Sequence, residues 1–110
     1  MIKILLLIIL LISFDVRSEM TVKDYLTSPE NDYMKLYISG IGQGLSWSNS
    51  MLESLKQKKL YCEPPKLSLN YQNYKNILDD TIKNLNKEDF EKITVGLTLT
   101  MGLMKTFPCK

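Results

Sequence analysis

The first hydrophobic block of the chain is a run of nine consecutive Ile or Leu residues, Ile4 to Ile12. A run of this length is too short to cross a bilayer, which takes about 20 apolar residues. It matches the hydrophobic region of a signal peptide, and Val16 and Ser18 are small residues placed as signal peptidase requires. We therefore expect residues 1–18 to be a cleaved signal peptide and residues 19–110 to be one domain. A retained N-terminal membrane anchor is the alternative.

After this block the apolar residues recur mainly at helical spacing. The spacing of Thr21 and Asp24 is that of a helix N-terminus and predicts a short opening turn. The segment Ser28-Pro29-Glu30 is a stronger start signal, because serine caps helices and proline is tolerated at the first helical position. We expect one helix from about Pro29 to Asn49. Its expected apolar positions are Met34, Tyr37, Ile38, Ile41, Leu45 and Leu52.

Three glycines, at positions 40, 42 and 44, lie in the middle of this expected helix. Each costs up to about 1 kcal/mol relative to alanine in a helix. We expect close packing against another backbone to offset this cost; a bent or broken helix is the alternative. Trp47 is expected in the core, with an exposed interface position as the alternative. The polar stretch from Ser50 to Lys59 either finishes the helix or forms a short second one.

The clearest helical pattern follows Glu63-Pro64-Pro65, a segment that favours an extended turn. Ser68 or Asn70 can cap the next helix. Apolar residues recur on one side of this helix, while the opposite side carries lysines, acids and an asparagine, so we expect an amphipathic helix with one core face. The apolar residues are Tyr71, Tyr74, Ile77, Leu78, Ile82 and Leu85.

The final apolar segment fits two patterns. Asn86 followed by Lys87, Glu88 and Asp89 is typical of a cap and an acidic first turn, and predicts that another helix begins there. Apolar residues then alternate from Ile93 onwards, which is strand periodicity, although helical spacing fits equally well. A lone strand would leave its backbone groups unpaired, so we expect a helix. The sequence therefore predicts an all-α fold, a small bundle of about four helices.

Composition narrows the functional classes. The whole chain has a formal charge of +2 and contains no histidine. After loss of the signal the charge is near neutral and every cation is a lysine, which argues against nucleic-acid binding. Histidine-dependent triads and zinc sites are excluded, and the adjacent acids Asp79-Asp80 and Glu88-Asp89 are expected to be solvated rather than convergent. We expect neither an enzyme nor a bound cofactor.

The chain has two cysteines, Cys62 and Cys109, each next to proline-containing sequence. In an exported chain two cysteines most often form a disulfide, because the compartment is oxidising. Two free thiols, or half of a metal site, are the alternatives. A bond would close a loop of 48 residues, counting both cysteines. In the chain-entropy model such a loop contributes about 4 kcal/mol.

Three segments together resemble a known family. They are the Y-x-x-G motif that begins at Tyr37, the segment Leu60-Tyr61-Cys62-Glu63-Pro64-Pro65, and the segment Phe107-Pro108-Cys109. Their order is similar to that in the Tai-type immunity proteins of the type VI secretion system, and the resemblance covers about Tyr33 to Cys109. It implies a small helical periplasmic protein, often a homodimer, in which Cys62 and Cys109 form the disulfide. It also implies a partner, a cell-wall amidase effector that the immunity protein neutralises.

No motif of the family transfers contact residues to this chain. The turn that contains Asn86, Lys87, Glu88 and Asp89 is polar, lies between expected helices and is remote in sequence from the cysteines. We take these four residues as candidate effector-binding residues. After signal cleavage we expect no membrane attachment. The alternative functions are a small periplasmic chaperone of the acid-stress type and an orphan exported helical protein without an effector.

Overall fold

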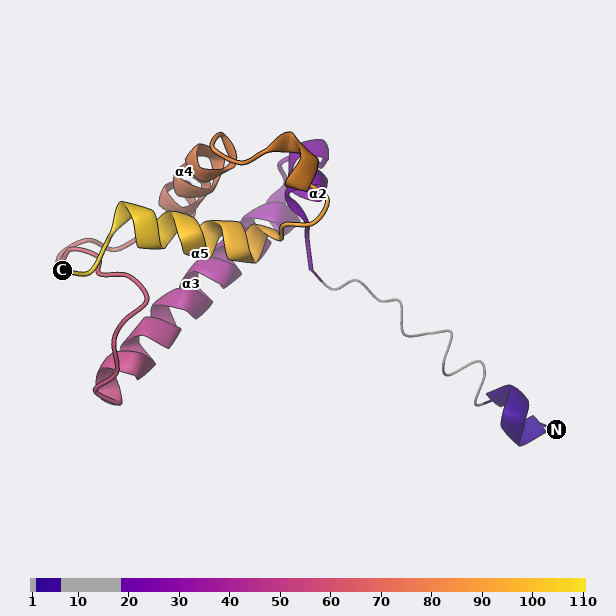
Figure 1. The fold of residues 1–110 in the computed structure, drawn as a ribbon, viewed down its shortest axis with the longest axis horizontal. Helices are drawn as coiled ribbons and strands as arrows, with labels where there is room; N and C mark the ends of the chain where they lie inside the picture. Colours follow the sequence, from indigo (N-terminus) through magenta and orange to yellow (C-terminus); the bar gives the residue numbers. More distant parts are fainter. Residues whose placement is uncertain (1, 7–18) are drawn as a thin grey trace.

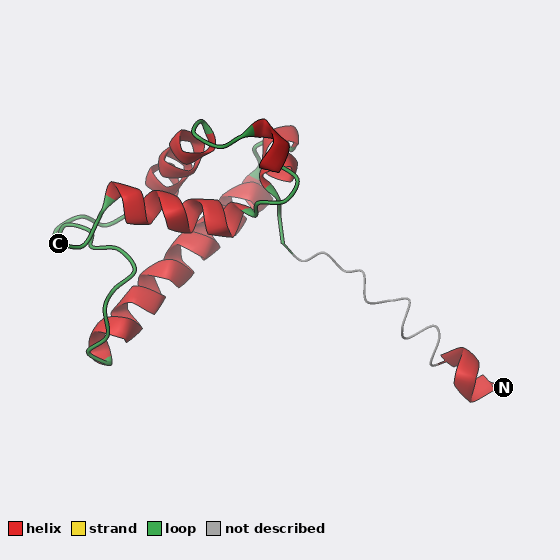
Figure 2. Cartoon of the chain, viewed as in Figure 1, coloured by secondary structure: helices red, strands yellow, loops and turns green. Residues whose placement is uncertain are grey.

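The computed structural model describes residues 2–6 and 19–110, so most of the expected signal peptide lies outside the described residues. Residues 2–6 are helical. The elements of residues 19–110 are α2 (Val22–Thr27), α3 (Asp32–Ser54), α4 (Tyr71–Ile82), the 3-10 turn η1 (Lys87–Asp89) and α5 (Val95–Thr106), drawn in Figures 1 and 2. Strand pairing in this part is limited to one bridge between Thr21 and Thr94. The expected all-α fold is confirmed.

The two N-terminal helices meet at a junction that differs from the expected one. Thr21 caps α2 and forms a capping box with Asp24, as the spacing predicted. Ser28, expected to cap α3, instead donates its hydroxyl to the Asp24 carbonyl, 2.5 Å away, at the end of α2. The cap of α3 is Asn31, whose side chain accepts from the Met34 N–H at 2.9 Å. The expected start of α3 at Pro29 was therefore three residues early.

Helix α3 is longer than expected and continuous through its glycines, ending at Ser54. A Cβ atom at Gly42 would lie 2.4 Å from the Tyr74 ring, so the absence of a side chain here lets α4 approach α3. Gly102 on α5 has the same role, because a Cβ there would lie 2.3 Å from the Thr81 hydroxyl. The expected close packing against another backbone is therefore wrong in its partner: Gly42 packs against a side-chain ring, and Gly40 and Gly44 have open space in place of a neighbour.

Helix α5 begins later than the sequence predicted. The segment after Asn86 makes only the short turn η1, and α5 starts at Val95 with Thr94 as its cap. The reason is that residues before Thr94 are held by α2: the Val22 N–H donates to the Ile93 carbonyl at 3.0 Å and the Lys23 N–H to that of Phe90 at 2.9 Å. The expected helix in the final apolar segment is confirmed, and the expected start at Asn86 is wrong.

The core lies between α4 and α5, which form the most extensive helix pair, and α3 and α2 close it from the sides. Helical spacing predicted five of its buried side chains, those of Met34, Ile38, Tyr74, Leu78 and Ile82, and the remaining six come from α2, α5 and the segment before Cys62. The buried apolar side chains form one cluster. They are Val22, Tyr25, Met34, Ile38, Tyr61, Tyr74, Leu78, Ile82, Val95, Leu99 and Leu103. Among the described helices, none has the length and hydropathy of a membrane span.

Candidate functional site

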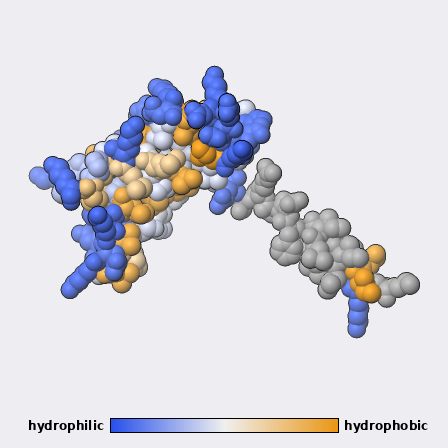
Figure 3. Space-filling view, in the orientation of Figure 1, coloured by the Kyte–Doolittle hydropathy of each residue, from blue (hydrophilic) through white to orange (hydrophobic). Residues whose placement is uncertain are grey.

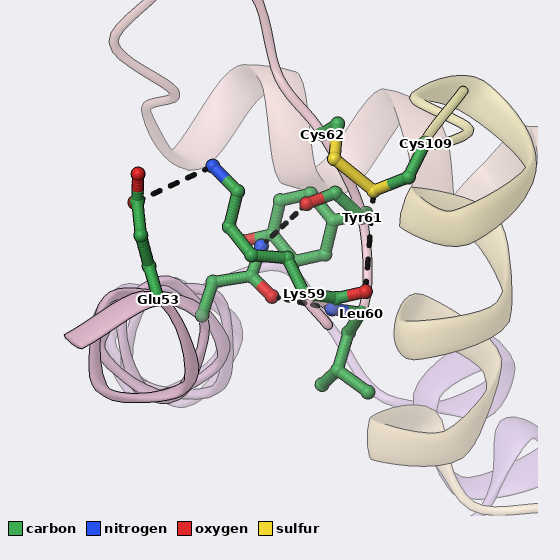
Figure 4. Close-up of a disulfide and its surroundings, with 7 residues drawn as sticks. Glu53, Lys59, Leu60, Tyr61, Cys62 and Cys109 are labelled. Carbon is green, nitrogen blue, oxygen red and sulfur yellow. Dashed lines mark hydrogen bonds and ion pairs between the residues drawn. A yellow bond between two sulfur atoms is a disulfide. The ribbon is translucent and has the colours of Figure 1, made fainter. Parts of the chain in front are cut away.

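A disulfide and a buried amide fix the long connection between α3 and α4. Cys62 is bonded to Cys109, with their Cα atoms 4.9 Å apart (Figure 4). The Cys62 N–H donates to the Phe107 carbonyl at 2.8 Å. Asn49 on α3 donates to the Tyr61 carbonyl and accepts from the Leu60 N–H, both at 2.8 Å. The connection is therefore held from α3 on one side and from the end of α5 on the other.

Tyr61, one residue before the disulfide, is fully buried. Burial and the nearby negative charge of Glu63 raise the pKa of its hydroxyl to about 12. This hydroxyl has no hydrogen-bond partner within the described part of the chain. The phenol therefore stays protonated at neutral pH, and its role here is to fill the core beneath the connection.

Asn49 was not identified from the sequence. The apolar pattern of α3 passes through Ile38, Ile41 and Leu45, and Asn49 lies one turn beyond Leu45 on the same side. A short amide on the buried side of a helix is a signal for a side chain that bonds the main chain of another segment. In α3 that segment is residues 60–61.

The candidate effector-binding turn lies at the end of the molecule opposite the C-terminus (Figure 1). Asn86, Lys87 and Glu88 are exposed, and Asp89 is half-buried. The Ile93 N–H donates to the Asp89 carbonyl at 2.9 Å, so the turn has a defined backbone although its side chains face solvent. The structure thus places the four residues together on one turn, in which the side chain of Asp89 is less accessible than the other three.

A polar cluster connects α2 to α4 next to a cavity of about 250 Å³. The Tyr25 hydroxyl donates to Asp79 at 2.6 Å, and the Lys75 ammonium donates to the same carboxylate at 2.7 Å. The Tyr71 hydroxyl donates to Glu30 at 2.7 Å. The expectation that Asp79 is solvated is met only in part, because the side chain is 35% exposed but one of its oxygens accepts from the Tyr25 hydroxyl of α2.

The titration of this cluster favours a structural role. Burial, followed by the hydrogen bond to Asp79, raises the pKa of Tyr25 well above its usual value. Burial and the bond to Glu30 raise the pKa of Tyr71 to about 12, and the bond to Asp79 raises the pKa of Lys75. At neutral pH the phenols stay protonated and the lysine stays charged. The bond from the Tyr25 hydroxyl to Asp79 links α2 to α4.

A second hollow of about 480 Å³ runs between α4 and α5. Ile77, Leu85 and Met101 supply an apolar lining, and Asp80 and Lys105 supply one charge of each sign. Thr81 and Gly102 also line the hollow, at the point where the two helices approach closely. The arrangement can accept an apolar side chain, and it contains no convergent set of titratable groups.

The exposed side of α3 carries large apolar side chains. Trp47 is 72% exposed, so its expected place in the core is wrong, and the other members are Tyr33, Leu36, Met51 and Leu55. Figure 3 shows hydrophobic side chains along the edge that α3 follows to its C-terminal end, where hydrophilic side chains surround them. Periodicity missed this face because α3 is apolar or small on two sides.

Within residues 2–6 and 19–110, no group of three or more acids or cysteines is placed to hold a metal ion. No protein-family model matches the chain, and neither the curated proteins nor the solved structures contain a match.

Proposed function

We propose that the chain is a periplasmic immunity protein that binds a type VI secretion peptidoglycan amidase and protects the producing cell. The resemblance of its cysteine segments to the Tai-type family is the source of this assignment. The observation that supports it most is the framework itself: four helices and one disulfide hold the polar η1 turn at one end of the molecule. An inhibitor that is ordered before binding loses less conformational entropy when it covers an enzyme cleft.

The proposed contact surface is the turn Asn86, Lys87, Glu88 and Asp89. Three of these residues are exposed, and local backbone bonds hold the turn: the Asp89 N–H donates to the Asn86 carbonyl at 3.0 Å, and the Ile93 N–H donates to the Asp89 carbonyl at 2.9 Å. Because the turn is paired through its backbone, its side chains are free to meet a partner without rebuilding the fold. The two carboxylates favour a basic contact on the amidase.

The experiment is to co-purify the complete chain with the product of an adjacent amidase-like gene and then to measure peptidoglycan hydrolysis. A stable complex without hydrolysis is the expected result. The double change Glu88→Lys with Asp89→Lys should weaken binding at least tenfold. The matched control is Asp80→Lys, an exposed acid on α4. If the double change leaves the affinity unchanged, the turn is not part of the interface. If no complex forms, the immunity assignment is wrong.

The exposed apolar side of α3 favours one alternative, a small periplasmic chaperone that binds unfolded clients at low pH. The chain has no histidine to sense pH between about 5 and 8, so the switch would have to come from its carboxylates. Protection of a client protein from acid aggregation would support this alternative. Aggregation at the same rate with and without the chain would exclude it.

A further inference from the structure

The outward side of α3 combines a long uncharged stretch with large exposed side chains. No charged residue occurs between Lys35 and Glu53. Tyr33, Leu36, Trp47, Met51 and Leu55, which are 61–73% exposed, follow one another at spacings of three, eleven, four and four residues. At about 100° per residue they fall within one arc of roughly 100° on the helix. We call these five residues, together with Gly40 and Gly44, the α3 face.

The two glycines make a notch in the middle of the α3 face. A Cβ at Gly40 or Gly44 would meet nothing within 4 Å, whereas Gly42, on the inward side, is covered by Tyr74. The glycines at 40 and 44 therefore serve no packing need inside the monomer, although each costs up to about 1 kcal/mol in helix propensity. Small residues four apart on an exposed helix side allow a second helix to approach closely.

We propose that the α3 face pairs antiparallel with the α3 face of a second copy of the chain. The pattern is self-complementary about Gly44. With the two-fold axis there, Tyr33 of each copy is level with Leu55 of the other. Trp47 of each copy lies next to Gly40 of the other, so the largest side chain meets the notch. A homodimer is also what the family resemblance implies, but the surface and its direction come from α3 alone.

Charges at the two ends of α3 favour the antiparallel direction. Asp32 begins the helix, and Lys56 and Lys58 follow its end. An antiparallel pair brings Asp32 of one copy level with Lys56 of the other, and it opposes the two helix dipoles. A parallel pair would place like charges together at both ends.

The size of the α3 face fits a second copy. The five exposed side chains present roughly 600–700 Å² of surface, close to the about 800 Å² that each partner buries in a standard protein interface. A lipid surface would also accept Trp47 and the neighbouring lysines, but it would give no reason for a glycine notch at the centre. The face therefore fits a helix better than a membrane.

The test uses the exported product of the complete 110-residue chain, purified with its disulfide intact. Sedimentation over about 1–100 μM should show a dimer that dissociates on dilution. Gly44→Leu should raise the dimer Kd at least tenfold, because a Cβ at this position meets nothing within 4 Å in the monomer, whereas the leucine would fill the notch that the pair needs. Gly96→Leu is the control, since Gly96 on α5 has the same open space away from the α3 face.

Direction is tested by charge exchange. Lys56→Asp alone should raise the Kd severalfold, and adding Asp32→Lys should restore it if the helices run antiparallel. A monomer throughout the range, or a dimer that Gly44→Leu leaves unchanged, would overturn the proposal. Failure of the double exchange to restore affinity would overturn the antiparallel direction. If the chain is a monomer that binds phosphatidylglycerol vesicles, and Trp47→Glu abolishes this binding, the α3 face is a membrane-binding surface and the proposal is overturned. None of these measurements involves an amidase, so the outcome is independent of the proposed function.

Discussion

The buried amide of Asn49 donates a 2.8 Å hydrogen bond to the carbonyl of Tyr61, joining α3 to the segment that carries the first cysteine. The same amide accepts from the Leu60 N–H at 2.8 Å. One side chain thus pairs a donor and an acceptor of a connection that has no secondary structure of its own. These two bonds therefore help to position Cys62 independently of the disulfide.

Replacing Asn49 with alanine should therefore destabilise the fold by about 2–4 kcal/mol, because a main-chain donor and acceptor lose their partners in a dry site. The measurement is the free energy of unfolding from urea titration followed by circular dichroism. Gln43→Ala, which removes an exposed amide from the same helix, is the control and should change stability little. Equal stabilities of the two variants would show that water replaces the Asn49 bonds.

Removing the disulfide by Cys62→Ser with Cys109→Ser should lower stability by about 4 kcal/mol, as expected for a bridge between residues 47 positions apart. The reason is that the unfolded chain regains the freedom of a long loop. Thermal unfolding with and without reductant measures the effect. Reductant should destabilise the native chain and leave the double variant unchanged. A native chain that is indifferent to reductant would contradict this expectation.

The glycines of the helices should separate into two groups. Gly102→Ala should destabilise the fold by about 1–3 kcal/mol, because its Cβ would lie 2.8 Å from Ile77 and closer still to Thr81. Gly96→Ala on the same helix meets nothing within 4 Å and should stabilise it by up to about 1 kcal/mol. Unfolding free energies of the two variants test this directly. Stabilisation in both would mean that α4 and α5 can move apart at no cost.

Stability should fall in strong alkali because of the buried phenols. The pKa of Tyr25 is raised in the folded state, first by burial and then by its bond to Asp79. The folded chain therefore keeps this proton where the unfolded chain, with a tyrosine pKa of about 10, has lost it. Stability from this group is complete below about pH 10 and decreases as the pH rises further, by up to about 1.4 kcal/mol per pH unit.

Unfolding free energies at about pH 8 and pH 11 measure this linkage. Tyr25→Phe should reduce the loss of stability between the two values, since the phenylalanine has no proton to lose. Tyr33→Phe is the control, because Tyr33 is exposed on α3 and outside the buried cluster. If both variants show the same alkaline loss as the native chain, Tyr25 does not contribute to it.

The helices that sequence predicted well are those with one apolar side. In α4, Tyr74, Leu78 and Ile82 recur at helical spacing and are buried, and Asn70 caps as expected. The late start of α5 could not be predicted, because it depends on the pairing of Thr94 with Thr21, a contact between distant segments. Local capping at Asn86 favoured an earlier start, and the tertiary contact overrode it.

The errors at the candidate sites have the same origin. Trp47 was expected in the core because it is large and apolar, but it lies on the exposed side of α3, together with Gly40 and Gly44. Asp79 was expected in solvent because it is charged, yet it is only 35% exposed and accepts from the Tyr25 hydroxyl of α2. In both cases the residue type gave the average behaviour, and the packing of another helix decided the outcome.

The backbone bonds that hold α2 set an order of folding. Helix α2 has six residues, too few to be stable alone, and the carbonyls of Phe90 and Ile93 accept from its first turn. These partners arrive only after the chain has closed most of its length, whereas α4 and α5 meet across one short connection. Helix α2 should thus be the last element to assemble and the first to exchange its amide hydrogens with solvent.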